Sequence, residues 1–225
     1  LAEEFVNMYI GHGGEFFEAG SAKPSINNAK GVATLNMLKK LADLSNPDYL
    51  THDSEAIKVE WEAGNVAIMT LWASRSGTLL DDEGDAKITA ATKLVAPATV
   101  GGGNIPAATL WWDGFTLAKN RSDADAEASF RAMAHAASSK EMVAKASDQA
   151  VWLVEGFVPG PKSVGVIEAV KMGAKPYPML PQMGLMHGAL GNEIVEFLQG
   201  NETAEQALKD VEAAYNIKAK EQGFL

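Results

Sequence analysis

Two adjacent tryptophans and an aspartate, Trp111, Trp112 and Asp113, are the side chains whose types and spacing point most directly to chemistry. Neighbouring side chains on an extended backbone face opposite ways, so one indole can enter a core while the other lines a surface or cleft. A flat indole covers the C–H groups of a sugar, and a carboxylate beside it accepts hydrogen bonds from hydroxyls. The triplet therefore fits a site for a polyhydroxylated ligand, and the alternative is that both rings belong to the core.

Three further side chains are candidate ligand residues. Trp72 directly follows the apolar run Val66–Leu71, which is predicted to be a buried strand because it is short and continuous. Open α/β sheets bind ligands at the carboxyl ends of their strands, which is where Trp72 would lie. Arg75 follows three residues later and could share a helical face with it, and His187 lies at the start of a predicted helix after a proline-rich approach.

Catalysis has no positive support in the sequence. Glycoside hydrolysis needs two opposed carboxylates in a cleft, and nothing nominates a partner for Asp113. The four histidines lie far apart, and the chain has no cysteine, so no metal site, disulfide or thiol nucleophile is expected. We expect no catalytic residue and no cofactor. A carbohydrate-active hydrolase that uses Asp113 and a purely structural interaction module remain the alternatives.

Composition narrows the classes of partner. The chain has 225 residues, of which 47% are hydrophobic and 21% charged, as in ordinary globular proteins. Its formal net charge of −10 argues against a nucleic-acid partner, which would need a basic surface. The longest apolar run, Val66–Ala73, is far shorter than the roughly 20 residues that span a bilayer, so membrane insertion is not expected.

The sequence opens on Leu1 rather than Met, so we expect a processed product or an excised piece.

Hydrophobic periodicity and capping residues predict a chain in which helices outnumber strands. Their alternation indicates an α/β protein. The predicted helices cover residues 1–12, 25–45, 54–63, 72–80, 122–137, 182–199 and 203–221, with another from 139. The predicted strands cover residues 66–71, 93–97 and 115–119.

The order of several segments resembles extracellular solute-binding proteins of sugar ABC transporters, the family 1 group that includes maltose-binding protein. Each motif alone is loose, and their common order over most of the chain carries the resemblance. The matching segments are Glu60–Trp72, Leu94–Pro97, Asp113–Ser122, Asp125–Glu141, and the closing pair Lys175–Met183 and Asn201–Leu208. The chain departs from the pattern at Trp111-Trp112, where glycines are usual, and at His187, where maltose-type relatives often have an aromatic residue.

This resemblance implies a fold, a domain organisation and roles for the candidate residues. The expected fold is a helix-rich α/β, periplasmic-binding-protein-like type II lobe from an incomplete two-lobe protein, with ligand held in the cleft between lobes. Residues 1–109 and 163–225 would form the C-terminal lobe. Residues 110–162 would be a hinge-crossing strand and a helical excursion of the N-terminal lobe, whose remainder is absent. Trp72 and Trp112 would stack on the ligand, Asp113 and Arg75 would bind its hydroxyls, and Trp111, partly core, and His187 would line the pocket.

The function implied is the non-catalytic binding of a sugar or polyol outside the cytoplasm, for delivery to the membrane permease of an ABC transporter. The expected location is periplasmic or extracellular, with lipid anchoring outside the membrane as a variant. Because much of one lobe would be missing, the excursion over 110–162 is expected to expose apolar surface or to pack on a second copy of the chain.

Overall fold

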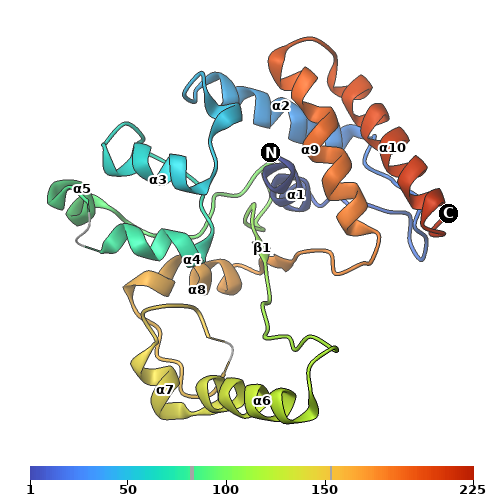
Figure 1. Cartoon of the computed structure of the whole chain (residues 1–225). Helices are drawn as coiled ribbons and strands as arrows, with labels where there is room; N and C mark the ends of the chain where they lie inside the picture. Colours follow the sequence, from blue (N-terminus) through green and yellow to red (C-terminus); the bar gives the residue numbers. More distant parts are fainter. Residues whose placement is uncertain (82–83, 153) are drawn as a thin grey trace. The chain divides into compact units, whose positions relative to one another are not determined.

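A computed structural model describes residues 1–81, 84–152 and 154–225 (Figure 1). The chain folds into two compact units, each built from separate stretches of sequence. Unit 1 contains Leu1–His52, Pro97–Trp111 and Val170–Leu225. Unit 2 contains Asp53–Ala96 and Trp112–Ala169.

Four helices form the framework of unit 1. They are α1 (Ala2–Gly11), α2 (Ala29–Asp43), α9 (Met183–Gln199) and α10 (Ala204–Glu221). Helices α9 and α10 form a hairpin in which they lie side by side (Figure 1). Gly200 ends α9 with a φ of 84°, a conformation that favours glycine, and Thr203 then caps α10 by accepting a hydrogen bond from the Gln206 amide.

The hydrophobic core belongs to unit 1 and is assembled from one face of each of these helices. Along α10 its members recur at helical spacing, so a single stripe of that helix faces inward. Its largest fully buried side chains include Phe5, Tyr9, Leu35, Met186, Leu190, Leu208 and Tyr215. The buried phenols keep hydrogen-bond partners: the Tyr215 hydroxyl donates to the carbonyl of Ala22 over 2.7 Å.

The start of α2 shows how a local polar side chain sets a helix boundary. A helix was predicted from residue 25, but α2 begins at Ala29 because Asn28 is its N-cap. The Asn28 side-chain oxygen accepts hydrogen bonds from the amides of Lys30 and Gly31, at 2.8 and 3.1 Å. Its amide group donates to the Tyr9 hydroxyl and to the Ser25 carbonyl, at 2.8 and 2.7 Å. These bonds hold residues 25–28 outside the helix.

The sheet of the described residues is a parallel pair within unit 1. Strand β1 (Thr109–Leu110) pairs with β2 (Lys175–Pro176), with Thr109 opposite Lys175. The Tyr177 amide continues the pairing by donating to the Leu110 carbonyl over 3.0 Å. Trp111 and Tyr177 are therefore the residues at the carboxyl ends of two neighbouring parallel strands.

Unit 2 consists of shorter helices joined by extended chain. They are α3 (Ser54–Glu62), α4 (Ala73–Ser76), α5 (Ala86–Ala91), α6 (Asp123–Ser138), α7 (Lys140–Lys145) and most of α8 (Val164–Lys171). Short 3-10 turns cover Tyr49–Thr51 in unit 1 and Gly77–Leu80 and Pro161–Ser163 in unit 2. Side-chain caps at Asp53, Asp85, Ser122 and Ser139 begin four of the helices, as capping preferences predict.

The predictions of strands over residues 66–71, 93–97 and 115–119 are wrong. These segments lie in unit 2, except for Pro97 in unit 1, and have no regular secondary structure; among the described residues none of them pairs into a sheet. Ile68 is 90% exposed, Val95 67% and Phe115 64%. Apolar character and β-propensity alone do not make a strand, because its backbone groups also need a neighbouring strand for hydrogen bonding.

Unit 2 buries few apolar side chains and exposes many. Among its described residues the buried apolar side chains are Leu79, Val143 and Ala169. Trp112 is 65% exposed, and Phe130 on α6 is 59% exposed. The expected exposure of apolar surface over residues 110–162 is therefore observed.

The sequence prediction places its domain boundaries at residues 109 and 162, and the chain passes between the two units at residues 111 and 169. Asp53–Ala96, however, groups with unit 2, whereas the sequence prediction placed it in one block with residues 1–52. The assignment of either unit to a lobe of a two-lobed protein stays a prediction.

Candidate functional site

Two aromatic rings in close, tilted contact lie at the carboxyl ends of β1 and β2. The ring centroids of Trp111 and Tyr177 are 4.2 Å apart, and their planes are inclined by 30°. Tyr177 is 9% exposed and Trp111 is 42% exposed, so the phenol ring is buried while the indole remains accessible. Close aromatic contacts of this kind stabilise a pair of rings by about 0.5–1.5 kcal/mol beyond their burial, so Tyr177 helps to hold the indole in place.

Polar groups of α1 and β1 fix the orientation of the Trp111 indole. Its Nε1–H donates to Thr109 Oγ1 over 3.0 Å, and Glu3 Oε1 lies 3.4 Å from the same nitrogen. Thr109 Oγ1 lies 2.7 Å from Glu3 Oε1 and 2.8 Å from Asn7 Oδ1. A hydroxyl has one proton, so Thr109 donates to one of these two acceptors at a time while it accepts from the indole. The ring is thus held from two sides, by Tyr177 and by Thr109.

Tyr177 also connects this pair to His187 on α9. Its hydroxyl lies 3.0 Å from His187 Nδ1, and the direction of the hydrogen bond depends on the histidine tautomer. Burial, helped by the negative charge of Glu3, raises the pKa of Tyr177 to about 12. The phenol therefore keeps its proton at neutral pH and can donate it to Nδ1 when that nitrogen carries none. This hydrogen bond fixes the Tyr177 ring and the His187 imidazole relative to each other.

This part of unit 1 combines side chains of three kinds. A partly exposed indole, an imidazole and a carboxylate lie near one another there. One oxygen of that carboxylate, Glu3 Oε2, is buried and has no hydrogen-bond partner within the part of the chain that the structure describes. An accessible aromatic face near polar groups suits a ligand with both C–H and hydroxyl surfaces.

Trp72 and Arg75 belong to unit 2 and lie at the start of α4. Trp72 is the N-cap residue of that short helix and is 42% exposed. Arg75 lies inside the helix, where its guanidinium forms an ion pair with Glu55 of α3. Both side chains of this pair are exposed, so the pairing is weak and a ligand could compete for the guanidinium.

Trp112 and Asp113 follow Trp111 in the sequence but belong to unit 2. The Trp112 indole lies close to the backbone of Gly114, two residues further along the chain. A Cβ atom placed on Gly114 would be 2.9 Å from Cη2 of this indole. The Asp113 side chain is exposed and forms no hydrogen bond or ion pair with the residues that the structure describes. Of the six predicted residues, the structure therefore joins Trp111 and His187, through Tyr177.

Sequence reasoning missed Tyr177, Thr109 and Glu3. Tyr177 had one weak signal, its place between Pro176 and Pro178 in the proline-rich approach to the predicted helix over residues 182–199. Thr109 lies in a strand of two residues, which is too short to produce an alternating pattern. Glu3 lies 108 residues from Trp111 in the sequence, and nothing near it suggests the contact.

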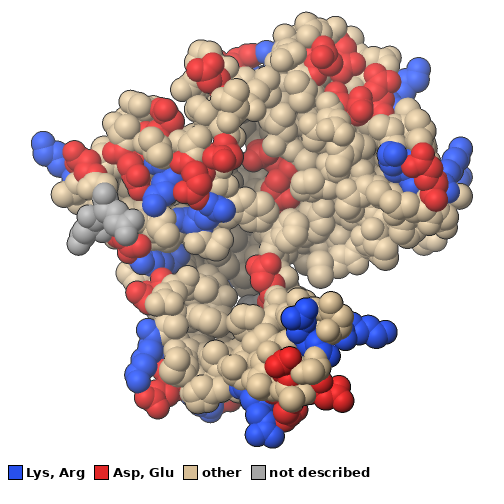
Figure 2. Space-filling model, in the orientation of Figure 1, with Lys and Arg blue, Asp and Glu red and all other residues tan. Residues whose placement is uncertain are grey.

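Charged side chains are spread over the rest of the surface. On the face seen in Figure 2, acidic and basic side chains are interspersed, and red side chains gather over the turn between α9 and α10. There the pKa of Glu202 is raised, by partial burial and by the charges of Asp210, Glu196 and Glu193. In the described ranges, no three histidines or carboxylates are grouped so as to hold a metal ion, and no helix is long and apolar enough to cross a membrane.

Comparison with known proteins gives a fold. No protein family and no curated sequence matches the chain. Among solved structures, a maltose-bound MalE3 of T. maritima superposes with a TM-score of 0.71 at 17% identity, over 95% of this chain and 56% of the other. A candidate oligosaccharide periplasmic-binding protein of Synechococcus sp. MITs9220, in complex with zinc, superposes with a TM-score of 0.70 at 12% identity, over 96% of this chain and 58% of the other.

These likenesses confirm the predicted fold class. The chain spans less than three fifths of the length of either protein, as a partial copy of the fold does. The chain therefore has the helix-rich α/β fold of periplasmic sugar-binding proteins, over a little more than half of that fold.

Proposed function

We propose that this protein binds a sugar or a polyol without chemically changing it. The observation that carries the proposal is the Trp111 indole, which contacts the Tyr177 ring, is hydrogen-bonded to Thr109 and belongs to a residue that is still 42% exposed. A ring held rigidly before the ligand arrives loses little conformational entropy on binding. Its position at the carboxyl ends of parallel strands is where open α/β sheets bind their ligands.

The likeness to a maltose-bound protein and to a candidate oligosaccharide-binding protein supports a saccharide as the ligand class. We further propose that the chain is a family 1 solute-binding protein, located outside the cytoplasm, that delivers its ligand to an ABC transporter permease. The order of motifs from Glu60 to Leu208 supports this finer assignment.

In this scheme the role of Trp111 differs from the sequence-based expectation, which had it line the pocket as a partly core residue: its partly exposed indole is proposed as the main contact of the ligand. His187 is proposed to line the same site beside Tyr177. Trp72 and Trp112 are proposed as further stacking rings, and Asp113 and Arg75 as partners of hydroxyl groups. We propose that residues 1–109 and 163–225 derive from a C-terminal lobe, that 110–162 derive from the other lobe, and that the apolar surface of 110–162 supports self-association.

A saccharide screen by thermal shift tests this function. A ligand that binds only the folded protein raises Tm by mass action, so maltose, maltotriose, other oligosaccharides and polyols are each added in excess. Trp111→Ala should abolish the response to the best ligand. Phe130→Ala is the matched control, since it removes an exposed aromatic ring of α6 outside the site and should leave the response intact.

Two outcomes would overturn the proposal. The first is the absence of any saccharide response in a folded protein, which would favour an interaction module. The second is release of product from an oligosaccharide by the wild-type protein but not by Asp113→Asn, which would show a hydrolase.

A further inference from the structure

A hairpin of unit 1, residues 98–107, packs against the C-terminal end of α1. Thr99 and Pro106 form an antiparallel bridge across it, and the Gly103 amide closes its turn by donating to the Val100 carbonyl over 2.9 Å. We call this segment the glycine hairpin, because its turn contains three consecutive glycines. It has no ionisable side chain, and it leads into β1.

The glycine hairpin approaches α1 too closely for side chains at the contact. A Cβ at Gly11, in the last turn of α1, would lie 2.7 Å from a methyl group of Val100. A Cβ at Gly103 would lie 3.2 Å from the Gly11 carbonyl oxygen. A Cβ at Gly101, where φ is +60°, would lie 2.3 Å from His12 Nδ1. The His12 imidazole therefore lies directly against the backbone of the hairpin.

His12, the C-cap residue of α1, is in an environment that suits a neutral imidazole. Its Nε2 atom is buried and has no hydrogen-bond partner among the described residues. Burial lowers the pKa of His12 below the ordinary value of 6.5, so the ring is uncharged at neutral pH. A neutral imidazole leaves one nitrogen without a proton, whereas an imidazolium carries an N–H on both. Protonation would therefore bury a charge and an N–H donor that has no acceptor.

Lys30 of α2 adds to the cost of a charge on His12. Its ammonium donates a hydrogen bond to the carbonyl of Gly13, the residue after His12, and would repel an imidazolium. The C-terminal carbonyls of α1 act the other way and favour a cation by about 0.3–1 kcal/mol. Because the pKa of His12 is lowered, burial outweighs this attraction.

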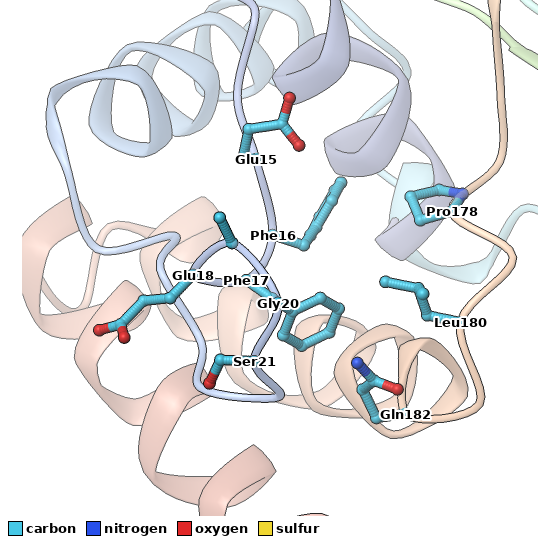
Figure 3. Close-up of a pocket in the computed structure, with 10 residues that line it drawn as sticks. Glu15, Phe16, Phe17, Glu18, Gly20, Ser21, Pro178, Leu180 and Gln182 are labelled. Carbon is cyan, nitrogen blue, oxygen red and sulfur yellow. The ribbon is translucent and has the colours of Figure 1, made fainter.

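Carboxylates of the surrounding elements do not offset that cost. Glu3 and Glu4 lie in the first turn of α1, at the opposite end of the helix from His12. Glu15 lies three residues after His12 but lines a separate pocket of about 390 Å³ (Figure 3), to which neither His12 nor the glycine hairpin contributes. Among the described groups, burial is the cause that lowers the pKa of His12, and no carboxylate raises it.

We propose that His12 is a latch that opens in acid: the neutral ring holds the glycine hairpin against α1, and protonation of the ring releases the hairpin. Release gives the ring nitrogens access to water, so the open state binds the proton more readily than the packed state. The latch therefore stabilises the packed hairpin fully above pH 6.5, the ordinary pKa of histidine. Its contribution is lost as the pH falls through the lower pKa of the packed state.

The latch also bears on the proposed sugar site, and this part of the inference rests on the proposed function. Ala107 lies against α1, since a Cβ added at Gly11 would be 3.4 Å from the Ala107 Cα atom. Thr109, which accepts a hydrogen bond from the Trp111 indole, follows two residues later. A released hairpin would hold that indole less firmly, so saccharide affinity should fall in acid by about two- to fivefold.

NMR spectroscopy of the whole chain between pH 7.5 and pH 5 tests the latch. The ring signals of His12 and the amide signals of Gly101, Gly102 and Gly103 should change with one common midpoint. Hydrogen exchange of the Gly103 and Ala107 amides, corrected for the intrinsic pH dependence of exchange, measures the opening of the hairpin. Their protection should fall by about three- to tenfold over this range.

Two variants at residue 12 separate the charge of the ring from its shape. His12→Asn and His12→Leu carry no side chain that takes up a proton between pH 7.5 and pH 5, so the protection of the hairpin should not depend on pH in either. His135→Asn is the matched control, because His135 is an exposed histidine of α6 in unit 2. This variant should keep the pH dependence of the wild type.

The latch is overturned if the His12 ring titrates while the hairpin amides do not change, or if hairpin protection is the same at both ends of the pH range. It is also overturned if a folded variant at residue 12 loses protection in acid as the wild type does. Saccharide titration at pH 7.5 and pH 5 tests the consequence for the site, and equal affinities while the hairpin opens would refute the link to Trp111. A protein that binds no saccharide at either pH refutes the proposed function, and the NMR result still decides the latch.

Discussion

The hydroxyl of Thr109 lies 3.0 Å from the indole nitrogen of Trp111 and links that ring to the carboxylate of Glu3 on α1. The rotamer of a partly exposed tryptophan is thus set with the help of a residue that lies 108 positions away in the sequence. If the ring is a ligand platform, its affinity depends on a hydroxyl that the ligand does not touch.

Thr109→Val tests this dependence, because it removes the hydroxyl and keeps the shape. We expect saccharide affinity to fall about three- to tenfold, the effect of losing one hydrogen bond that orients the ring. Isothermal titration with the best ligand of the thermal-shift screen measures the change. Thr89→Val on α5 is the control, since no side-chain hydrogen bond of Thr89 occurs among the described residues. Equal affinities of both variants would show that Thr109 does not position the ring.

The raised pKa of Tyr177 predicts a loss of stability in alkali. The folded state holds the phenol proton up to about pH 12, while the unfolded chain releases it near pH 10. The contribution of this proton to stability is therefore complete below pH 10 and is lost as the pH rises toward 12. Urea unfolding of the wild type and of Tyr177→Phe between pH 9 and 12 should show a shallower decline for the variant. Parallel declines would contradict a buried, protonated Tyr177.

Gly31 in α2 is predicted to tolerate no side chain. A Cβ there would lie 2.1 Å from the Ile26 carbonyl oxygen and 2.9 Å from a methyl group of Leu208. Gly31→Ala should therefore destabilise the protein by about 1–3 kcal/mol, as overpacking does. A Cβ at Gly188 on α9 would have no atom within 4 Å of it. Gly188→Ala should therefore stabilise the protein by about 0.5–1 kcal/mol, because alanine favours a helix over glycine. Thermal unfolding compares the two, and a Tm that rises in both would refute the close contact.

Asn28 is predicted to stabilise unit 1 through both ends of its amide. Asn28→Ala removes the cap of α2 and should cost about 1–2 kcal/mol. Asn28→Asp keeps the oxygen that accepts from Lys30 and Gly31 but loses the donors to Tyr9 and Ser25. Its cost should therefore lie between those of wild type and Asn28→Ala in urea denaturation. An aspartate variant as unstable as the alanine variant would show that the cap contributes little.

The features predicted correctly from the sequence depend on neighbours within a few residues. The core-facing stripe of α10 and the start of α3 after Asp53 follow from periodicity and capping, which act locally. The segment 66–71 was predicted wrongly because a strand requires a partner elsewhere in the chain. The same limit applies to the site. Trp111 and His187 were each recognised by type, but the ring that joins them, Tyr177, is defined by the pairing of β1 with β2.

The confinement of the hydrophobic core to unit 1 has a consequence for how the protein denatures. A region that buries little apolar surface can open locally at a small fraction of the free energy of global unfolding. The amide hydrogens of α6 and α7 should therefore exchange with solvent long before those of α9 and α10. Urea titration should then show two transitions, the first with the smaller m-value. Limited proteolysis under native conditions should accordingly cut within residues 112–163 first and leave α9 and α10 intact.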